Sequence, residues 1–171
     1  MDEPAHHVVI DGRKWRATDP AVPDRFRAEL VDELMAARRA VGAARRSEAA
    51  TAEAGARRRV HDAKVALGER GHPWWEPTTV EQRAPRIRST VLALARHRAP
   101  EGSICPSDVA RAIGGSAWRS LMDEVRDQAR DLAVADEVHL SARGQVLDPA
   151  DPPRGPIRIR LGPAPADQPA P

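Results

Sequence analysis

The chain has 171 residues, with 27 Lys or Arg and 25 Asp or Glu, so its formal net charge at pH 7 is only +2. A charge this small excludes a global field that attracts polyanions, so any nucleic-acid site has to come from a local cluster. The single cysteine, Cys105, excludes an intrachain disulfide and a zinc site built from several cysteines.

The N-terminal residues predict a two-stranded β-hairpin. The apolar run Val8, Val9 and Ile10 precedes Asp11-Gly12, and Trp15 follows it. Asp-Gly between short apolar runs favours a type I′ turn, because both central positions of that turn need a positive φ. We expect the strand to end before Pro20.

Apolar residues at helical spacing then predict two helices, at residues 23–46 and at about 56–69. The first stripe consists of Phe26, Leu30, Val31, Leu34, Met35 and Val41, and the second of Val60, Ala63 and Leu67. Gly71 is the predicted terminator of the second helix. Residues 47–56 are weakly patterned and either continue the helix or form a mobile tip. We expect an antiparallel helical hairpin, with Trp74 and Trp75 covering its open end.

The second half of the chain has the element order of a winged helix. Ile87, Val91, Leu92, Leu94 and Ala95 predict a first helix, Pro106 begins a second, and Gly114-Gly115 turns the chain into a third that carries Trp118, Leu121, Met122, Val125, Ala129 and Leu132. Residues 103–105 are expected to be a short extended segment. The runs VHLS and PIRIRL predict a two-stranded ribbon, in which Ile157 to Leu161 alternate between apolar and charged residues.

The predicted architecture is therefore mainly α with small β content, in two modules. Residues 1–76 form the β-hairpin and helical-hairpin module, 77–83 a linker, 84–162 the winged helix-turn-helix domain, and 163–171 a disordered tail rich in Pro and Ala. No signal peptide and no apolar run of roughly 20 residues is present, so we expect a cytoplasmic protein that does not enter a membrane.

Three motifs in the second half carry a family resemblance. They are CPSDVAR at residues 105–111, Trp118-Arg119 with Met122, Val125 and Arg126, and RGPIR at residues 154–158. In this order they resemble an uncharacterised bacterial family, a numbered domain of unknown function, which implies a winged-helix fold and no established activity. Residues 10–16, 29–41 and 59–76 are similar to uncharacterised actinobacterial proteins sometimes labelled biopolymer transport, a label that nothing else in the sequence supports.

Two arginine clusters lead to the main functional hypothesis: the chain is a non-enzymatic interaction protein that binds nucleic acid. Its role could be regulatory. The cluster on the helical hairpin comprises Arg38, Arg39, Arg45, Arg46, Arg57, Arg58 and Arg59, and the cluster on the wing comprises Arg143, Arg154, Arg158 and Arg160. Such patches suit phosphate contacts. Both clusters could also be solubilising surface, and DNA cannot be distinguished from RNA at this stage.

Two alternatives remain open. The third helix carries Asp123, Asp127 and Asp131 four residues apart, an acidic ridge of the wrong sign for phosphates, and this predicts a protein adaptor that docks a basic partner without nucleic acid. Cys105, at a helix N-terminus, could instead be the nucleophile of an enzyme if His97 or His139 served as its base. The histidine spacing gives no metal set, and we expect no cofactor.

Overall fold

The computed structural model describes residues 5–151 and 155–163, and it confirms the N-terminal hairpin. Strands β1 (His7–Ile10) and β2 (Arg13–Arg16) pair antiparallel. The turn residues Asp11 and Gly12 have φ of 50° and 74°, as a type I′ turn requires. Arg154 and residues 164–171 of the predicted tail lie outside the described residues.

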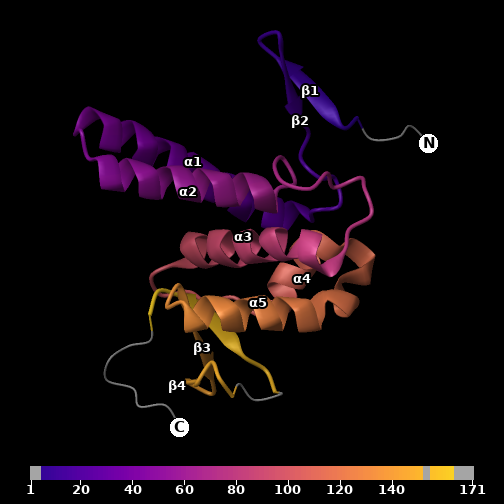
Figure 1. The fold of residues 1–171 in the computed structure, drawn as a ribbon, viewed down its shortest axis with the longest axis vertical. Helices are drawn as coiled ribbons and strands as arrows, with labels where there is room; N and C mark the ends of the chain where they lie inside the picture. Colours follow the sequence, from indigo (N-terminus) through magenta and orange to yellow (C-terminus); the bar gives the residue numbers. More distant parts are fainter. Residues whose placement is uncertain (1–4, 152–154, 164–171) are drawn as a thin grey trace.

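The helical hairpin also forms. Helix α1 (Asp24–Arg46) and helix α2 (Ala50–Ala66) run antiparallel, and only residues 47–49 turn the chain between them (Figure 1). Helix α2 begins about two turns earlier than predicted, because Ala50, Ala52 and Ala54 favour helix although they provide no apolar stripe. The expectation of a continued helix or a mobile tip over 47–56 is therefore wrong for most of that stretch.

Helix α2 ends at Ala66, and the glycine that terminates it is Gly68 rather than the predicted Gly71. The Gly68 amide donates to the Val65 carbonyl at 3.0 Å, and the Glu69 amide donates to the Lys64 carbonyl at 2.8 Å. These two bonds form a Schellman motif, in which the residue after the cap takes a left-handed conformation. Gly68 has a φ of 80° and fills that position.

Helix α3 (Val80–Arg98) lies at the centre of the fold and packs on α1, α2 and α5 (Met122–Val134). Its N-terminus is a capping box between Thr79 and Gln82, so part of the predicted linker forms the first turn of this helix. One buried cluster contains Leu30 of α1, Leu94 of α3 and Val125 of α5. The two predicted modules therefore share a hydrophobic core.

Arginines of α3 connect this helix to its neighbours, which accounts for part of the arginine content of the chain. Arg98 pairs with Glu29 of α1 at 2.8 Å and with Asp108 at 2.9 Å. These hydrogen bonds, the Glu29 bond foremost, raise the pKa of the Arg98 guanidinium above its ordinary value. Arg96 pairs in the same way with Asp62 of α2 at 2.6 Å.

The region between the second and third predicted helices differs from expectation. Helix α4 (Pro106–Gly114) begins as predicted, but the 3₁₀ helix η1 (Gly115–Leu121) precedes α5, so the prediction that the third helix carries Trp118 and Leu121 is wrong. A Cβ on Gly114 would lie 2.7 Å from the Leu121 side chain. This close approach places Leu121 against the end of α4, and the tighter 3₁₀ turn accommodates it.

A small antiparallel sheet closes the fold. Its strands β3 (Val138–Ala142), β4 (Gln145–Val146) and β5 (Arg158–Leu161) have the order β4-β3-β5, so the ribbon gains one strand over the prediction. Ile104 forms a bridge to Ile159, which confirms the predicted extended segment at 103–105. In β5, Ile159 is buried and Arg158 is exposed, as the alternation predicts, whereas Leu161 at the end of the strand is 37% exposed.

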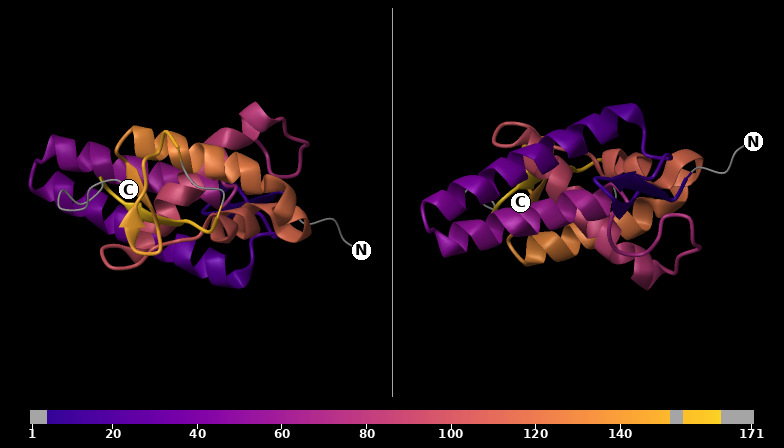
Figure 2. Two further views of the ribbon diagram at one scale, coloured as in Figure 1. Left: turned by 90° about the horizontal axis from the view of Figure 1, so that it is seen from below. Right: turned by 90° about the horizontal axis from the view of Figure 1, so that it is seen from above.

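The elements are arranged in layers (Figure 1). The α1–α2 pair lies on one side of α3, while α5 and the three-stranded sheet lie on the other. The β-hairpin lies over the end of the α1–α2 pair that is opposite to the turn at 47–49 (Figure 2). The α1–α2 surface and the sheet therefore occupy opposite sides of the molecule.

Candidate functional site

The seven arginines predicted on the helical hairpin lie along α1 and α2 between the turn and about the middle of each helix, and carboxylates engage three of them. Arg59 binds Glu33 of α1 at 2.8 Å, and the Glu33 side chain is only 3% exposed. Hydrogen bonds to Glu33 raise the pKa of the Arg59 guanidinium. Arg59 therefore links the two helices through a buried ion pair.

The second ion pair on this hairpin is exposed and shared. Arg45 of α1 and Arg57 of α2 lie 2.9 Å and 2.8 Å from the same oxygen of Glu53. These two hydrogen bonds hold the pKa of the Glu53 carboxyl below its ordinary value. Both guanidinium groups remain more than half exposed, so they stay accessible to a ligand.

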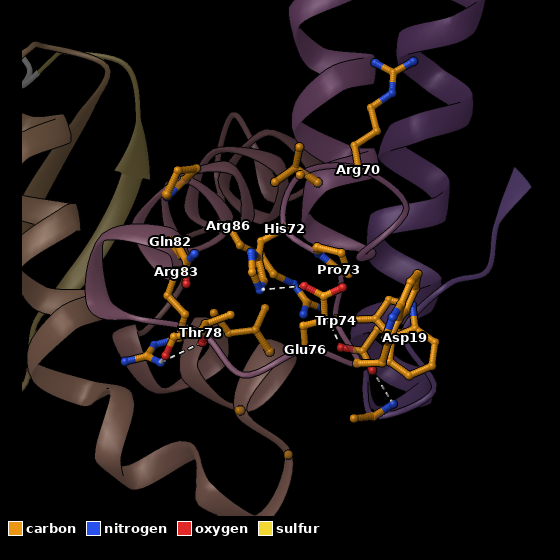
Figure 3. Close-up of a pocket in the computed structure, with 18 of the residues that line it drawn as sticks. Asp19, Arg70, His72, Pro73, Trp74, Glu76, Thr78, Gln82, Arg83 and Arg86 are labelled. Atoms are coloured by element: carbon orange, nitrogen blue, oxygen red, sulfur yellow. Dashed lines mark hydrogen bonds and ion pairs between the residues drawn. The ribbon is translucent and has the colours of Figure 1, made fainter. Parts of the chain in front are cut away.

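Arg45 and Arg57 belong to a groove that we call the arginine groove. It has a volume of about 300 Å³ and is lined by Arg38, Val41, Arg45, Arg57, Val60 and Arg70. Two valines form an apolar floor, and four guanidinium groups from both helices and the loop after α2 surround it. Figure 3 shows the Arg70 side chain extended along the helical pair.

Several arginines of the helical hairpin and of the loop after α2 have no carboxylate partner within the described residues. In residues 5–151 and 155–163, no carboxylate lies within 4.0 Å of the guanidinium of Arg38, Arg39, Arg46, Arg58 or Arg70. All five residues are exposed. A multivalent anion laid along the groove would meet several unneutralised charges at once.

Arg70 was not among the residues predicted from the sequence. It stands eleven residues beyond the last arginine of the cluster, after the end of α2. The Schellman turn at Gly68 reverses the chain there, and this brings the Arg70 side chain back over the helices. No local sequence signal indicates that placement.

The arginines of the sheet are bound to the chain segment beside them. Arg158 donates to the Ser103 carbonyl and hydroxyl at 2.9 Å and contacts the Cys105 sulfur. Arg160 donates to the Glu101 carbonyl at 2.6 Å. Arg143 is exposed at the β3–β4 turn, whereas Arg154 lies outside the described residues. The sheet and hairpin clusters do not form one surface, because α3 and α5 lie between them (Figure 1).

The acidic residues predicted on the third helix are all exposed on α5. Asp123, Asp127 and Asp131 are spaced four residues apart, and Asp127 pairs with Arg130 at 3.1 Å. Glu124, one residue from the ridge, is instead half-buried and pairs with Arg83 of α3 at 2.8 Å. The outer face of α5 thus carries net negative charge.

A larger cavity of about 540 Å³ lies between α3, the α4–η1 turn and the loop after α2. Figure 3 shows Arg83 beside Thr78 and the Arg70 side chain directed away from the rest of the cavity. Arg86 pairs with Asp19 at 2.8 Å, and Arg83 donates to the Thr78 carbonyl and to Glu124. These contacts pair Arg83 with Glu124 and Arg86 with Asp19, whereas Arg70, which also lines the cavity, has no carboxylate partner within the described residues. Sequence reasoning did not find this cavity, because its lining comes from separate parts of the chain.

The residues considered for catalysis and metal binding are not brought together. Within the described residues, no hydrogen bond joins Cys105 to His97 or His139, and His139 contacts the Gly162 carbonyl instead. Across the same residues, no group of three or more His, Cys, Asp and Glu side chains is arranged to hold a metal ion. None of the described helices combines the length and the apolar character needed to span a bilayer.

Comparison with known families gives one match. Residues 84–162 match the model of a family described as a protein of unknown function, DUF3253. This range covers α3 through β5 and agrees with the resemblance that the motifs of the second half carry. No curated protein matches the chain.

Proposed function

We propose that the chain is an interaction protein that binds nucleic acid through the arginine groove of the α1–α2 hairpin. The observation that carries this proposal is the convergence of Arg38, Arg45, Arg57 and Arg70 around one groove, where Glu53 pairs with only two of them. Guanidinium groups bind phosphate oxygens with two parallel hydrogen bonds, so this arrangement suits a sugar–phosphate backbone.

We also propose that α3, α4, α5 and the three-stranded sheet form a winged-helix domain. The order of three helices followed by an antiparallel sheet supports this proposal. In a winged helix that reads DNA, the third helix enters the major groove. The exposed Asp123, Asp127 and Asp131 make α5 unsuited to that role, which is why we assign nucleic-acid binding to the arginine groove. Arg143 is the exposed candidate on the sheet.

A protein adaptor remains the second proposal. The exposed acidic ridge on α5 favours it, because only Asp127 among its three residues is paired within the described chain. A basic partner would dock on this ridge and leave the arginine groove free. The same purified protein tests both proposals, because the two surfaces lie on different sides of α3.

The decisive experiment is fluorescence anisotropy with mixed-sequence DNA duplexes and RNA at two salt concentrations. If four arginines contact phosphates, the slope of log K against log salt is about −3.6, and affinity falls by about 150-fold between about 50 mM and 200 mM salt. Absence of binding at the lower salt would leave the arginines as solubilising surface and would favour the adaptor.

Substitution then locates the contact. Arg38→Gln combined with Arg70→Gln removes two unpaired cations and is expected to make the salt slope shallower by about 1.8. Arg143→Gln and Asp123→Asn are the controls for the sheet and for α5. A larger loss of affinity with Arg143→Gln would move the site to the sheet.

A further inference from the structure

A second groove lies between the β-hairpin and the α1–α2 pair, and we call it the hairpin groove. It has a volume of about 630 Å³. Its apolar lining consists of Val8, Ile10 and Trp15 from the hairpin and Val31, Leu34 and Met35 from α1. Val8 pairs across the strands with Trp15, and Ile10 pairs with Arg13. Residues that are directly opposite one another lie on the same face of a hairpin, so one whole face of the hairpin forms a wall of the groove.

The walls of this groove do not close on each other. Ile10 is 56% exposed, Val8 42%, Trp15 40% and Met35 37%, although these side chains line one cavity. The hairpin is held at its base, where Arg16 donates to the Gly71 carbonyl and Trp74 donates to the Ala17 carbonyl. Lys64 of α2 also lies over the Trp15 ring, 5.2 Å from its centroid. A contiguous patch of apolar side chains that remains exposed to solvent is typical of an interaction site.

The rim of the hairpin groove is positively charged. It carries Arg13, Arg16, Arg38 and Lys64, with Asp11 and Glu69 as the acids. Glu69 is already bound to Lys64 at 3.0 Å, so these two charges cancel. The remaining three arginines and Asp11 together carry a net charge of +2. An occupant with apolar side chains and carboxylates would match both the walls and the rim.

We propose that the hairpin groove binds an acidic amphipathic helix of a partner protein. The walls consist of side chains from two elements, and recognition through side chains suits a helix, whose backbone satisfies its own hydrogen bonds. The apolar face of such a helix, with residues at i, i+3, i+4 and i+7, would lie on Ile10, Trp15 and Met35. Its carboxylates would lie within reach of Arg13 and Arg38. This role is additional to nucleic-acid binding, and it does not use Arg45, Arg57 or Arg70.

The test uses the full chain and a synthetic fluorescent peptide of about 18 residues, with Leu at the apolar positions and Glu on the opposite face. Anisotropy is expected to show saturable binding at low salt. A peptide with Lys in place of Glu is expected to bind at least about tenfold more weakly, and a peptide with Ser in place of Leu is expected not to bind. Equal binding of the Glu and Lys peptides would overturn the proposed charge match.

Substitutions of groove residues test whether the peptide binds in the hairpin groove. Ile10→Ser and Met35→Ser are each expected to weaken peptide binding at least about fivefold, because both side chains line the groove. Val9→Ser is the matched control, since Val9 is 72% exposed but lies on the other face of the hairpin, paired with Lys14. Circular dichroism melts verify that each variant folds.

Two results would overturn the proposal. One is an equal effect of Val9→Ser and Ile10→Ser on peptide affinity. The other is self-association of the chain that Ile10→Ser abolishes, because a second copy would then be the occupant. Nucleic-acid affinity of Ile10→Ser is expected to equal that of the wild type, so failure of this proposal is distinguishable from failure of the arginine groove.

Discussion

Arg59 of α2 donates hydrogen bonds to both carboxylate oxygens of Glu33 in α1, at 2.8 Å and 2.9 Å. The pair joins the two helices of the hairpin at a point where Glu33 is shielded from water. An arginine that belongs by sequence to a candidate phosphate-binding cluster thus contributes to folding. Its substitution changes stability, and binding experiments on this hairpin have to keep it intact.

The first prediction concerns this pair. Arg59→Ala leaves the Glu33 carboxylate buried without its partner and is expected to lower the free energy of unfolding by about 3 kcal/mol. Arg58→Ala, one residue away and exposed, is expected to change it by no more than about 0.5 kcal/mol. Urea denaturation of the two variants measures the difference. Similar midpoints for both would show that the pair contributes little.

The second prediction concerns the carboxylate of the arginine groove. Glu53→Gln removes the charge that competes with phosphate for Arg45 and Arg57, so nucleic-acid affinity is expected to rise by about fivefold. Glu48→Gln removes the same charge from the same end of the hairpin, but within the described chain Glu48 pairs with no arginine. Its expected effect on affinity is smaller. A rise of equal size in both variants would point to net charge alone.

The third prediction is a pH dependence of stability. The hydrogen bonds from Arg45 and Arg57 hold the folded-state pKa of Glu53 below its ordinary value of 4.5. Near these pH values the unfolded chain therefore binds more protons than the folded chain. The contribution of Glu53 is complete above about pH 4.5 and is lost as the pH falls through the folded-state pKa.

Glu53→Gln carries no titrating carboxyl at this position, so it is expected to lose less stability on acidification than the wild type does. Urea denaturation midpoints of both proteins between about pH 6 and pH 3 measure this difference, because urea is uncharged and does not screen the pair. Parallel losses over the whole range would contradict the prediction. The control is Glu48→Gln, which keeps the Glu53 pair.

The fourth prediction separates backbone strain from packing. Gly68 and Gly144 have φ of 80° and 82°, so an alanine at either position pays the left-handed penalty of about 1 kcal/mol. A Cβ on Gly68 would also lie 3.0 Å from Asp19 and from Trp74, whereas a Cβ on Gly144 meets nothing within 4 Å. Gly68→Ala is therefore expected to cost about 2 to 3 kcal/mol and Gly144→Ala about 1. Thermal melts compare the two, and equal costs would exclude the packing contribution.

Features that depend on neighbouring residues were predictable from the sequence. Asp11-Gly12 predicts the hairpin turn because a positive φ is a local requirement. The stripe that includes Leu30 and Leu34 predicts α1 because burial of one helical face produces a fixed spacing. Pro106 marks the start of α4 for the same local reason.

Local rules failed where distant residues decide the conformation. The start of α2 lacks an apolar stripe and was missed, and the contact between Gly114 and Leu121 replaces the first turns of the expected third helix by 3₁₀ helix. Gly68, which terminates α2 in place of Gly71, also packs closely against Trp74 and Asp19, residues that lie outside the helix. These contacts join residues that the spacing of apolar residues in the sequence does not relate, so they could not be predicted from it.

Most of the helices and strands, the first turn and the positions along the chain at which arginine is concentrated follow from the sequence alone, although η1 and β4 do not. Only the tertiary structure decided which arginines are available, because charge pairing depends on residues far apart in sequence: Glu33 engages Arg59, while Arg70 joins Arg38 at the arginine groove. The hairpin groove likewise exists only once β1 and β2 lie beside α1. Ion pairs and cavities are properties of distances in space, and those are fixed by packing.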